Sequence, residues 1–249
     1  MSIRYLAFCG LALLLSPVAA HAQAAPGATN APAATAPKAP DVKVDPHSQA
    51  LGEAMARMDA NDVDGAIAKL TVAIQTNPKD SIPFVLRASA YCQKKMWAEA
   101  QADFKSAAQL DPTNAVIQFN IVEVQFMQKH YDAARAGYAA IVKDPEMGDL
   151  AAYKVFLCDL LAGHEALAQK ERDAFDSVNS RPSYYFSRAA WDLYHKNNDG
   201  ARSWLTSVAN IFPSAKITYY ALPLKDLGWL PIPPSNASSA VNGTLNSTQ

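Results

Sequence analysis

The sequence predicts an all-α chain in which pairs of helices repeat and stack into a solenoid. Three observations predict it: small and aromatic residues recur every 34 positions, prolines close helical runs at related spacings, and the alternating pattern of β-strands is nearly absent. A composition of 50% hydrophobic and 18% charged residues provides enough apolar surface for a folded core.

The clearest repeated feature is a column of alanines at a constant step of 34 residues. Its members are Ala66, Ala100, Ala134 and Ala168. A second column at the same step is large and apolar, and it contains Leu70, Phe104 and Tyr138. A small residue followed four positions later by a large one suits two helices that approach closely, because the large side chain fills the space beside the contact.

Prolines indicate where the second helix of each pair ends. Pro78 and Pro112 are 34 residues apart, and Pro145 and Pro213 are separated by twice that step. Proline has no backbone N–H and clashes with the preceding turn, so a helical run ends before it. We therefore expect a helix, tight turn and helix in each repeat.

The second unit, residues 81–114, carries the most complete pattern. Its pattern-bearing residues are Phe84, Ala88, Tyr91, Trp97, Ala100, Phe104, Ala107 and Pro112. This pattern resembles the tetratricopeptide repeat (TPR) family, and the chain resembles an exported bacterial member of it. The resemblance implies a right-handed helical-hairpin solenoid of about five repeats. The units are residues 47–80, 81–114, 115–148, 149–181 and 182–215.

The fourth unit, residues 149–181, departs from this pattern. Arg172 stands where an aromatic residue is expected, and no proline closes the unit. Its helix boundaries are therefore less well defined by the sequence than those of the other four.

The N-terminus has the organisation of a Sec-type signal peptide over residues 1–22. Arg4 is followed by an apolar run at 6–15 and by the small-x-small sequence that ends at Ala22. The run is shorter than the roughly 20 residues that span a bilayer, so we expect cleavage near Ala22 and no stable membrane anchor afterwards. The mature protein is expected to be periplasmic or secreted.

The remaining chain divides by composition. Residues 23–46 are rich in alanine and proline, and residues 231–249 are uncharged and rich in serine, asparagine and threonine. We expect both to be disordered, because neither can bury enough apolar surface to offset its conformational entropy. Between them we expect a solenoid at 47–216 and a C-terminal capping segment at 217–230, which is rich in large apolar residues.

The sequence favours a protein that is not an enzyme. The mature chain has no GxSxG, HExxH, phosphate-loop or paired CxxC motif, so we expect no catalytic, cofactor or metal residues. A net charge of −1 without a basic cluster argues against nucleic acid as a partner. An enzyme that uses Cys92, Cys158 or the histidines of the inter-helix turns stays as a disfavoured alternative, and we expect both cysteines to be free.

The resemblance implies that the first helix of each repeat lines a concave groove that binds peptides. One row of candidates at the relevant offsets is Leu51, Val85, Phe119, Tyr153 and Phe186. A second row is Met58, Cys92, Phe126, Leu160 and Leu193, and Met55 joins them in the first unit. Regularly spaced apolar residues are also what a buried core requires, and this alternative stays open.

These observations predict a protein-binding scaffold or adaptor of the cell envelope. Its partner would be a protein or peptide with an apolar or amphipathic segment, unless the chain's own residues 222–234 fold back into the groove. A structural or self-associating role in an envelope assembly is the alternative, and the sequence leaves the oligomeric state open.

Overall fold

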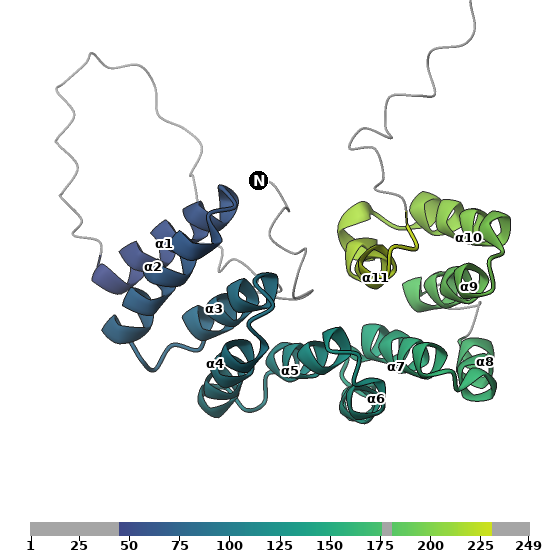
Figure 1. Ribbon diagram of the computed structural model, residues 1–249, viewed down its shortest axis with the longest axis horizontal. Coiled ribbons are helices and arrows are strands. Elements are labelled where there is room, and N and C mark those ends of the chain that lie inside the picture. Colours follow the sequence, from purple (N-terminus) through teal and green to yellow (C-terminus); the bar gives the residue numbers. More distant parts are fainter. Residues whose placement is uncertain (1–44, 176–180, 231–249) are drawn as a thin grey trace, which may run out of the picture. The chain divides into compact units, whose positions relative to one another are not determined.

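The computed structural model describes residues 45–175 and 181–230, which fall into two compact units divided in the sequence between Val124 and Gln125 (Figure 1). The predicted signal peptide, most of the predicted spacer and the predicted tail lie outside the described residues.

The regular elements of the described residues are eleven helices, and these residues contain no strand. The helices of the first unit are α1 (Pro46–Asp59), α2 (Val63–Thr76), α3 (Ile82–Gln93) and α4 (Trp97–Leu110). Helix α5 (Ala115–Met127) contains the division between the units. The helices of the second unit are α6 (Tyr131–Ala139), α7 (Gly148–Ala162), α8 (Glu165–Ala174), α9 (Pro182–Tyr194), α10 (Asn198–Ile211) and α11 (Ser214–Asp226). The all-α prediction is confirmed.

The first unit is a stack of helical hairpins. Helix α1 packs on α2, α2 on α3 and α3 on α4. The column residues Ala66, Leu70, Ala100 and Phe104 are all fully buried in one hydrophobic cluster. In the second unit Ala134 and Ala168 are equally buried, so each alanine of the predicted column lies at a helix contact.

The turn inside each hairpin contains one residue with a left-handed backbone. Asn61, Lys95 and Lys129 have φ between 58° and 63°, and Gly163 continues the same 34-residue step with φ of 81°. Lys196 follows 33 residues after Gly163, with φ of 64°, because the fourth unit is one residue shorter. Three lysines thus adopt a conformation that costs a non-glycine residue roughly 1 kcal/mol, and the packed hairpins keep them in it.

Three helices end where the prolines predict. Helices α2, α4 and α10 end two residues before Pro78, Pro112 and Pro213 respectively. The third unit differs, because α6 ends at Ala139, well before Pro145. Consecutive turns follow α6, in which Ile141 donates to the Tyr138 carbonyl and Asp144 to the Ile141 carbonyl. Pro145 therefore lies in a loop and does not close that helix.

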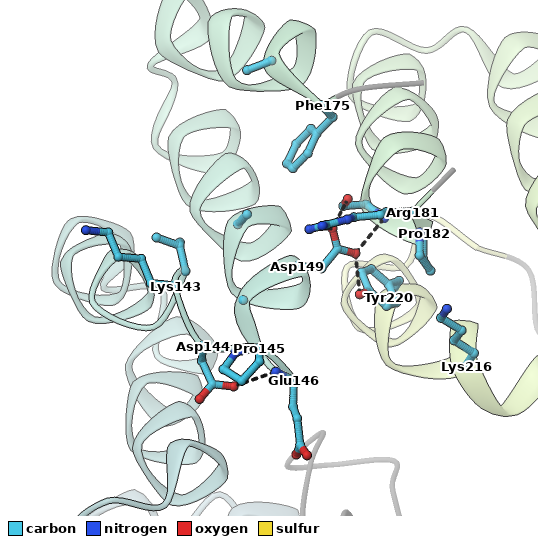
Figure 2. A pocket seen from close by; sticks show the side chains of 15 residues that line it. Lys143, Asp144, Pro145, Glu146, Asp149, Phe175, Arg181, Pro182, Lys216 and Tyr220 are labelled. Atoms are coloured by element: carbon cyan, nitrogen blue, oxygen red, sulfur yellow. Dashed lines mark hydrogen bonds and ion pairs between the residues drawn. The ribbon is translucent and has the colours of Figure 1, made fainter. Parts of the chain in front are cut away.

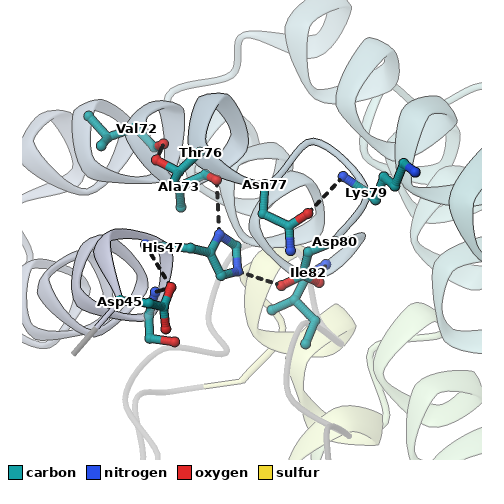
Figure 3. Close-up of polar contacts among 10 residues, drawn as sticks. Asp45, His47, Val72, Ala73, Thr76, Asn77, Lys79, Asp80 and Ile82 are labelled. Atoms are coloured by element: carbon teal, nitrogen blue, oxygen red, sulfur yellow. Dashed lines mark hydrogen bonds and ion pairs between the residues drawn. The ribbon is translucent and has the colours of Figure 1, made fainter. Parts of the chain in front are cut away.

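A histidine joins the start of the first unit to the connection between its second and third helices (Figure 3). The His47 Nδ1 atom lies 3.0 Å from the Ala73 carbonyl oxygen, and Nε2 lies 2.8 Å from Asp80 Oδ2. The Asp45 carboxylate caps α1 by accepting hydrogen bonds from the backbone N–H groups of His47 and Ser48. The hydrogen bond to the Ala73 carbonyl and the contact with Asp80 raise the pKa of His47 above its ordinary 6.5.

This contact predicts a pH-dependent stability of the first unit. A raised pKa in the folded state means that the His47 contribution is fully present below pH 6.5 and is lost as the pH rises through the pKa of the folded state. We expect the urea midpoint of unfolding, measured by circular dichroism, to fall from acidic to alkaline pH in the wild type. In His47→Gln this fall should be smaller. His130→Gln, at an exposed turn position, is the control and should follow the wild type. An unchanged slope in His47→Gln would contradict this account.

Candidate functional site

Most of the predicted groove residues are buried in the structure. The buried members are Met58, Val85, Cys92, Phe119, Phe126, Tyr153, Leu160 and Phe186. Leu51 and Leu193 are partly exposed, and Met55 is 44% exposed. This burial favours the core interpretation for the first eight, and a role of any of the eleven in partner contact stays a prediction.

In the second unit, helix α11 covers two of the predicted row. The Tyr220 ring stacks on Phe186 with centroids 5.7 Å apart, and it lies 5.7 Å from the Tyr153 ring. Tyr220 itself is only 8% exposed. It lies two residues before the segment 222–234, for which a covering role was expected. The face made by α7 and α9 is thus occupied by the chain's own helix at this point.

A shared carboxylate connects these three helices (Figure 2). The Tyr220 hydroxyl donates to Asp149 Oδ2 at 2.7 Å, and the Ser183 hydroxyl donates to Asp149 Oδ1 at 2.6 Å. Burial, and then the negative charge of Asp149, raise the pKa of Tyr220 far above its ordinary value, so the phenol remains a donor. Asp149 on α7, Ser183 on α9 and Tyr220 on α11 form what we call the tyrosine latch.

A polar cavity of about 650 Å³ lies beside the tyrosine latch (Figure 2). Phe175 and Pro182 form part of its wall, and Lys143, Glu146 and Lys216 are exposed side chains on its lining. Its other carboxylates already have partners, because Asp149 belongs to the latch and the Asp144 carboxylate accepts from the Glu146 and Met147 backbone N–H groups. The cavity therefore presents charged groups at its edge and not an apolar binding surface.

A second hollow of about 650 Å³ is predominantly apolar and lies among α9, α10 and α11. We call it the apolar hollow, and its main apolar side chains are Phe186, Leu193, Leu205, Ile217, Trp229 and Leu230. Its one charged lining residue, Arg202, is largely exposed and pairs with Asp199 at 2.8 Å. Leu193 is the predicted groove residue that is partly exposed and also lines this hollow.

Sequence reasoning did not identify the apolar hollow. Leu205 fits the repeat pattern as a packing residue, and the pattern does not reveal which helices cover it. Among the described residues the only helix that follows α10 is α11, whereas every earlier hairpin is followed by a complete one. The available signal was the incomplete sixth unit after Pro213.

An ionic cluster around the buried carboxylate of Asp159 lies between α6, α7 and α8. Arg135 Nε contacts both oxygens of the fully buried Asp159 at 2.9 and 2.7 Å, and Arg135 Nη2 donates to Glu171 Oε1 at 2.9 Å. His164 Nδ1 lies 3.3 Å from Asp159 Oδ1. Burial, and then repulsion by Asp159, raise the pKa of Glu171 to about 7. The cluster holds three helices together and opens on neither cavity.

The residues of the enzyme alternative do not form a site in the described part of the chain. No disulfide joins Cys92 to Cys158, as expected, and both are buried, so substrate cannot reach their thiols in this conformation. His130 and His164 precede α6 and α8 as their capping residues, and His195 follows α9. Within residues 45–175 and 181–230, no group of three His, Cys, Asp or Glu residues is arranged to hold a metal ion.

None of the described helices is long and apolar enough to cross a membrane.

The tyrosine latch predicts that the Tyr220 hydroxyl makes a measurable contribution to the free energy of unfolding. Tyr220→Phe keeps the stacked ring but removes the shorter of two hydrogen bonds to Asp149 Oδ2, which leaves this partly buried oxygen only the Ser183 backbone N–H at 3.4 Å and costs about 1 to 3 kcal/mol. We expect a lower free energy of unfolding in urea. Tyr219→Phe, on the same helix but outside the latch, should change it by less than about 0.5 kcal/mol. Equal effects of the two substitutions would show that the hydroxyl contact is unimportant.

The ionic cluster predicts the direction of a second pH effect. Because the pKa of Glu171 is raised from 4.5 to about 7, its favourable contribution is complete below pH 4.5 and disappears as the pH rises through 7. Glu171→Gln should therefore be more stable than the wild type at pH 8 and show a flatter dependence of the urea midpoint on pH. Glu146→Gln, at an exposed position, is the control. A variant less stable than the wild type at pH 8 would contradict the assignment.

Comparison with known proteins identifies the repeats. Residues 91–153 match a family model described as tetratricopeptide repeat. No curated protein sequence matches the chain.

Three solved structures are similar to the chain at TM-scores of 0.50 to 0.53. PilF of Pseudomonas aeruginosa is 16% identical, with 73% of this chain and 91% of that chain covered and a TM-score of 0.52. The MamA protein is 17% identical, with 76% and 98% covered and a TM-score of 0.50. PilW, a widely conserved type IV pilus biogenesis factor, is 19% identical, with 73% and 86% covered and a TM-score of 0.53.

At these identities the likeness shows the fold alone, and it extends the paired-helix architecture beyond the residues that the family model matches. The tetratricopeptide repeat match extends from Tyr91 to Tyr153, and helical hairpins of the same kind lie on both sides of the matched residues.

Proposed function

We propose that this chain is a non-catalytic scaffold of the cell envelope that binds an apolar or amphipathic helix of another protein in the apolar hollow. The observation that carries the proposal is the hollow itself. Three helices contribute apolar side chains to a space of about 650 Å³ whose one charged lining residue is at the edge and already paired. Contact between such a surface and apolar groups is favourable, by about 25 cal/mol for each Å² of apolar surface removed from water.

The repeat architecture supports a helix as the occupant. In a solenoid, the apolar face of one hairpin is covered by the helices of the next. Leu205 and Ala209 on α10, with Ile217 on α11, lie where the second helix of a further hairpin would pack, and the described chain places only Trp229 and Leu230 there. An amphipathic helix from a partner would complete the missing hairpin.

The rim of the hollow suits the polar edge of such a helix. Asn198, Thr206 and Asn210 lie on its lining and are all exposed. Their side chains can donate and accept hydrogen bonds without requiring a particular charge on the partner. Apolar contact in the centre and uncharged polar contact at the edge is the usual composition of a specific protein interface.

Two observations support an envelope location. The first 22 residues have the pattern of a signal peptide. The structural neighbour PilW is a type IV pilus biogenesis factor, although its low identity transfers no function by itself.

The proposal predicts that one charge in the hollow weakens partner binding. Leu205→Asp places a carboxylate among apolar side chains, and the partner helix would have to desolvate it. Ile211→Asp is the matched control, since Ile211 is on the same helix, is 50% exposed and does not line the hollow. Each variant would be checked by circular dichroism for retention of the helical fold.

Binding would be measured by photo-cross-linking in the host, with a photoreactive residue at position 206 and, as the control site, at position 211. The captured protein would then be purified and titrated with the wild type and with both variants. We expect at least a tenfold loss of affinity, or about 1.4 kcal/mol, for Leu205→Asp and no change for Ile211→Asp. A cross-link to a second copy of the chain would show that the hollow mediates self-association. A cross-link to the chain's own C-terminal residues would show that these residues fill the hollow. Either result would contradict the proposed partner.

A further inference from the structure

Two arginines occupy the same position in two repeats but have different partners. Arg87 on α3 is the seventh residue of unit 81–114, and Arg188 on α9 is the seventh residue of unit 182–215. Arg87 Nε and Nη2 donate to the two oxygens of Asp103 at 2.7 and 2.8 Å, and Nη1 donates to the Thr71 hydroxyl at 2.9 Å. Asp103, whose side chain is 8% exposed, thus neutralises Arg87 inside the fold.

The fifth repeat keeps the arginine and replaces both of its partners. The residue 16 positions after Arg87 is Asp103, whereas the residue 16 positions after Arg188 is Trp204. The residue 16 positions before Arg87 is Thr71, whereas Arg172 stands at that distance before Arg188. The carboxylate is therefore lost and a second guanidinium is added at the same place in the hairpin packing.

The hydrogen bonds of Arg188 reflect this change. Its Nη1 donates to the carbonyl oxygens of Tyr184 at 3.1 Å and of Arg172 at 3.4 Å. The Nε and Nη2 atoms of Arg188 have no acceptor among the described residues, whereas the same two atoms of Arg87 donate to Asp103. Burial, followed by repulsion from Arg172, lowers the pKa of Arg188.

Aromatic rings surround this guanidinium. Arg188 Cζ lies 3.7 Å from the centroid of the Tyr184 ring and 5.9 Å from that of Trp204. Arg172 Cζ lies 4.3 Å from the centroid of the Trp191 ring. A cavity of about 230 Å³, which is large enough for a small side chain, is lined by Arg172, Arg188, Trp191 and Trp204 but not by Tyr184.

The carboxylates of the cavity are already engaged. Asp173 pairs with Arg172 at 2.8 Å, and Asp192 accepts a hydrogen bond from the Asn197 side chain at 3.0 Å. Among the described residues, Arg188 is left without an acidic partner in direct contact, and its Nε and Nη2 have the spacing that accepts a carboxylate in parallel.

We propose that Arg188, with Arg172 and the indoles of Trp191 and Trp204, binds an acidic side chain of a peptide, which takes the place that Asp103 occupies beside Arg87. The inference rests on the proposed function only in taking a protein as the partner. Its surface is distinct from the apolar hollow. The planar carboxylate would form two charge-assisted hydrogen bonds, and the indoles would contact the apolar residue next to it.

The test uses two dipeptides that differ by one charge, acetyl-Phe-Glu-amide and acetyl-Phe-Gln-amide, titrated into the ¹⁵N-labelled chain. The readout is the shift of the indole N–H resonances of Trp191 and Trp204. We expect the glutamate peptide to bind at least about tenfold more tightly than its neutral twin and to lose this advantage in Arg188→Gln. Arg202→Gln, which removes an exposed guanidinium on α10, is the control and should retain it.

A second variant rebuilds the arrangement of the second repeat. Trp204→Asp supplies the internal carboxylate, so it should abolish binding of the glutamate peptide although it removes no cation. If the loss of the ring destabilises the fold, Arg188→Gln still decides the outcome.

Several results would overturn the inference. They are equal binding of the two peptides, unchanged binding by Arg188→Gln, and binding of inorganic phosphate without a preference for the glutamate peptide. Leu205→Asp should leave this site intact, so the two proposals can be separated. If a partner binds through Leu205 but the chain shows no preference for the glutamate peptide, this inference fails and the scaffold function stands.

Discussion

The close contact between paired helices at the alanine column is the constraint on which the rest of the structure depends. Ala66, Ala100, Ala134 and Ala168 are fully buried, each on the second helix of a hairpin. A larger side chain there would push the helices apart and, in the first three hairpins, open space around the large apolar residue four positions later. The left-handed turn residues follow from the same constraint, because the helices must reverse direction within two or three residues to make this contact.

Helix α11 plays a double role in the second unit. Through Tyr220 it covers the rings of Tyr153 and Phe186 and completes the hydrogen bonds of Asp149. No second helix follows it within the residues that the structure describes, so in this part of the chain the outer part of α10 around Leu205 lacks the cover that a full repeat would provide. The stabilising latch and the apolar hollow are therefore both consequences of how α11 packs on the last described hairpin.

The positions where the repeats differ are more informative about function than those where they agree. The shared residues serve packing, and any member of this architecture needs them. The change from the Arg87 and Asp103 pair to Arg188 and Trp204 brings no gain in internal electrostatics, since it leaves a half-buried guanidinium without its carboxylate. A repeat protein provides its own internal reference for such changes, because equivalent positions have equivalent surroundings.

The sequence by itself determined the helical class, the spacing of the hairpins and the identity of the buried alanines. These follow from a periodic pattern, and a pattern is local information that can be read along the chain. It also revealed two regularly spaced apolar rows, but it could not decide between a groove and a core. That decision depends on what covers each residue. Tyr220 covers Phe186, and the lack of a helix beyond α11 in the described residues leaves Leu205 accessible. The partners of Arg87 and Arg188 likewise lie on neighbouring helices, so only the tertiary structure showed which guanidinium is neutralised within the fold.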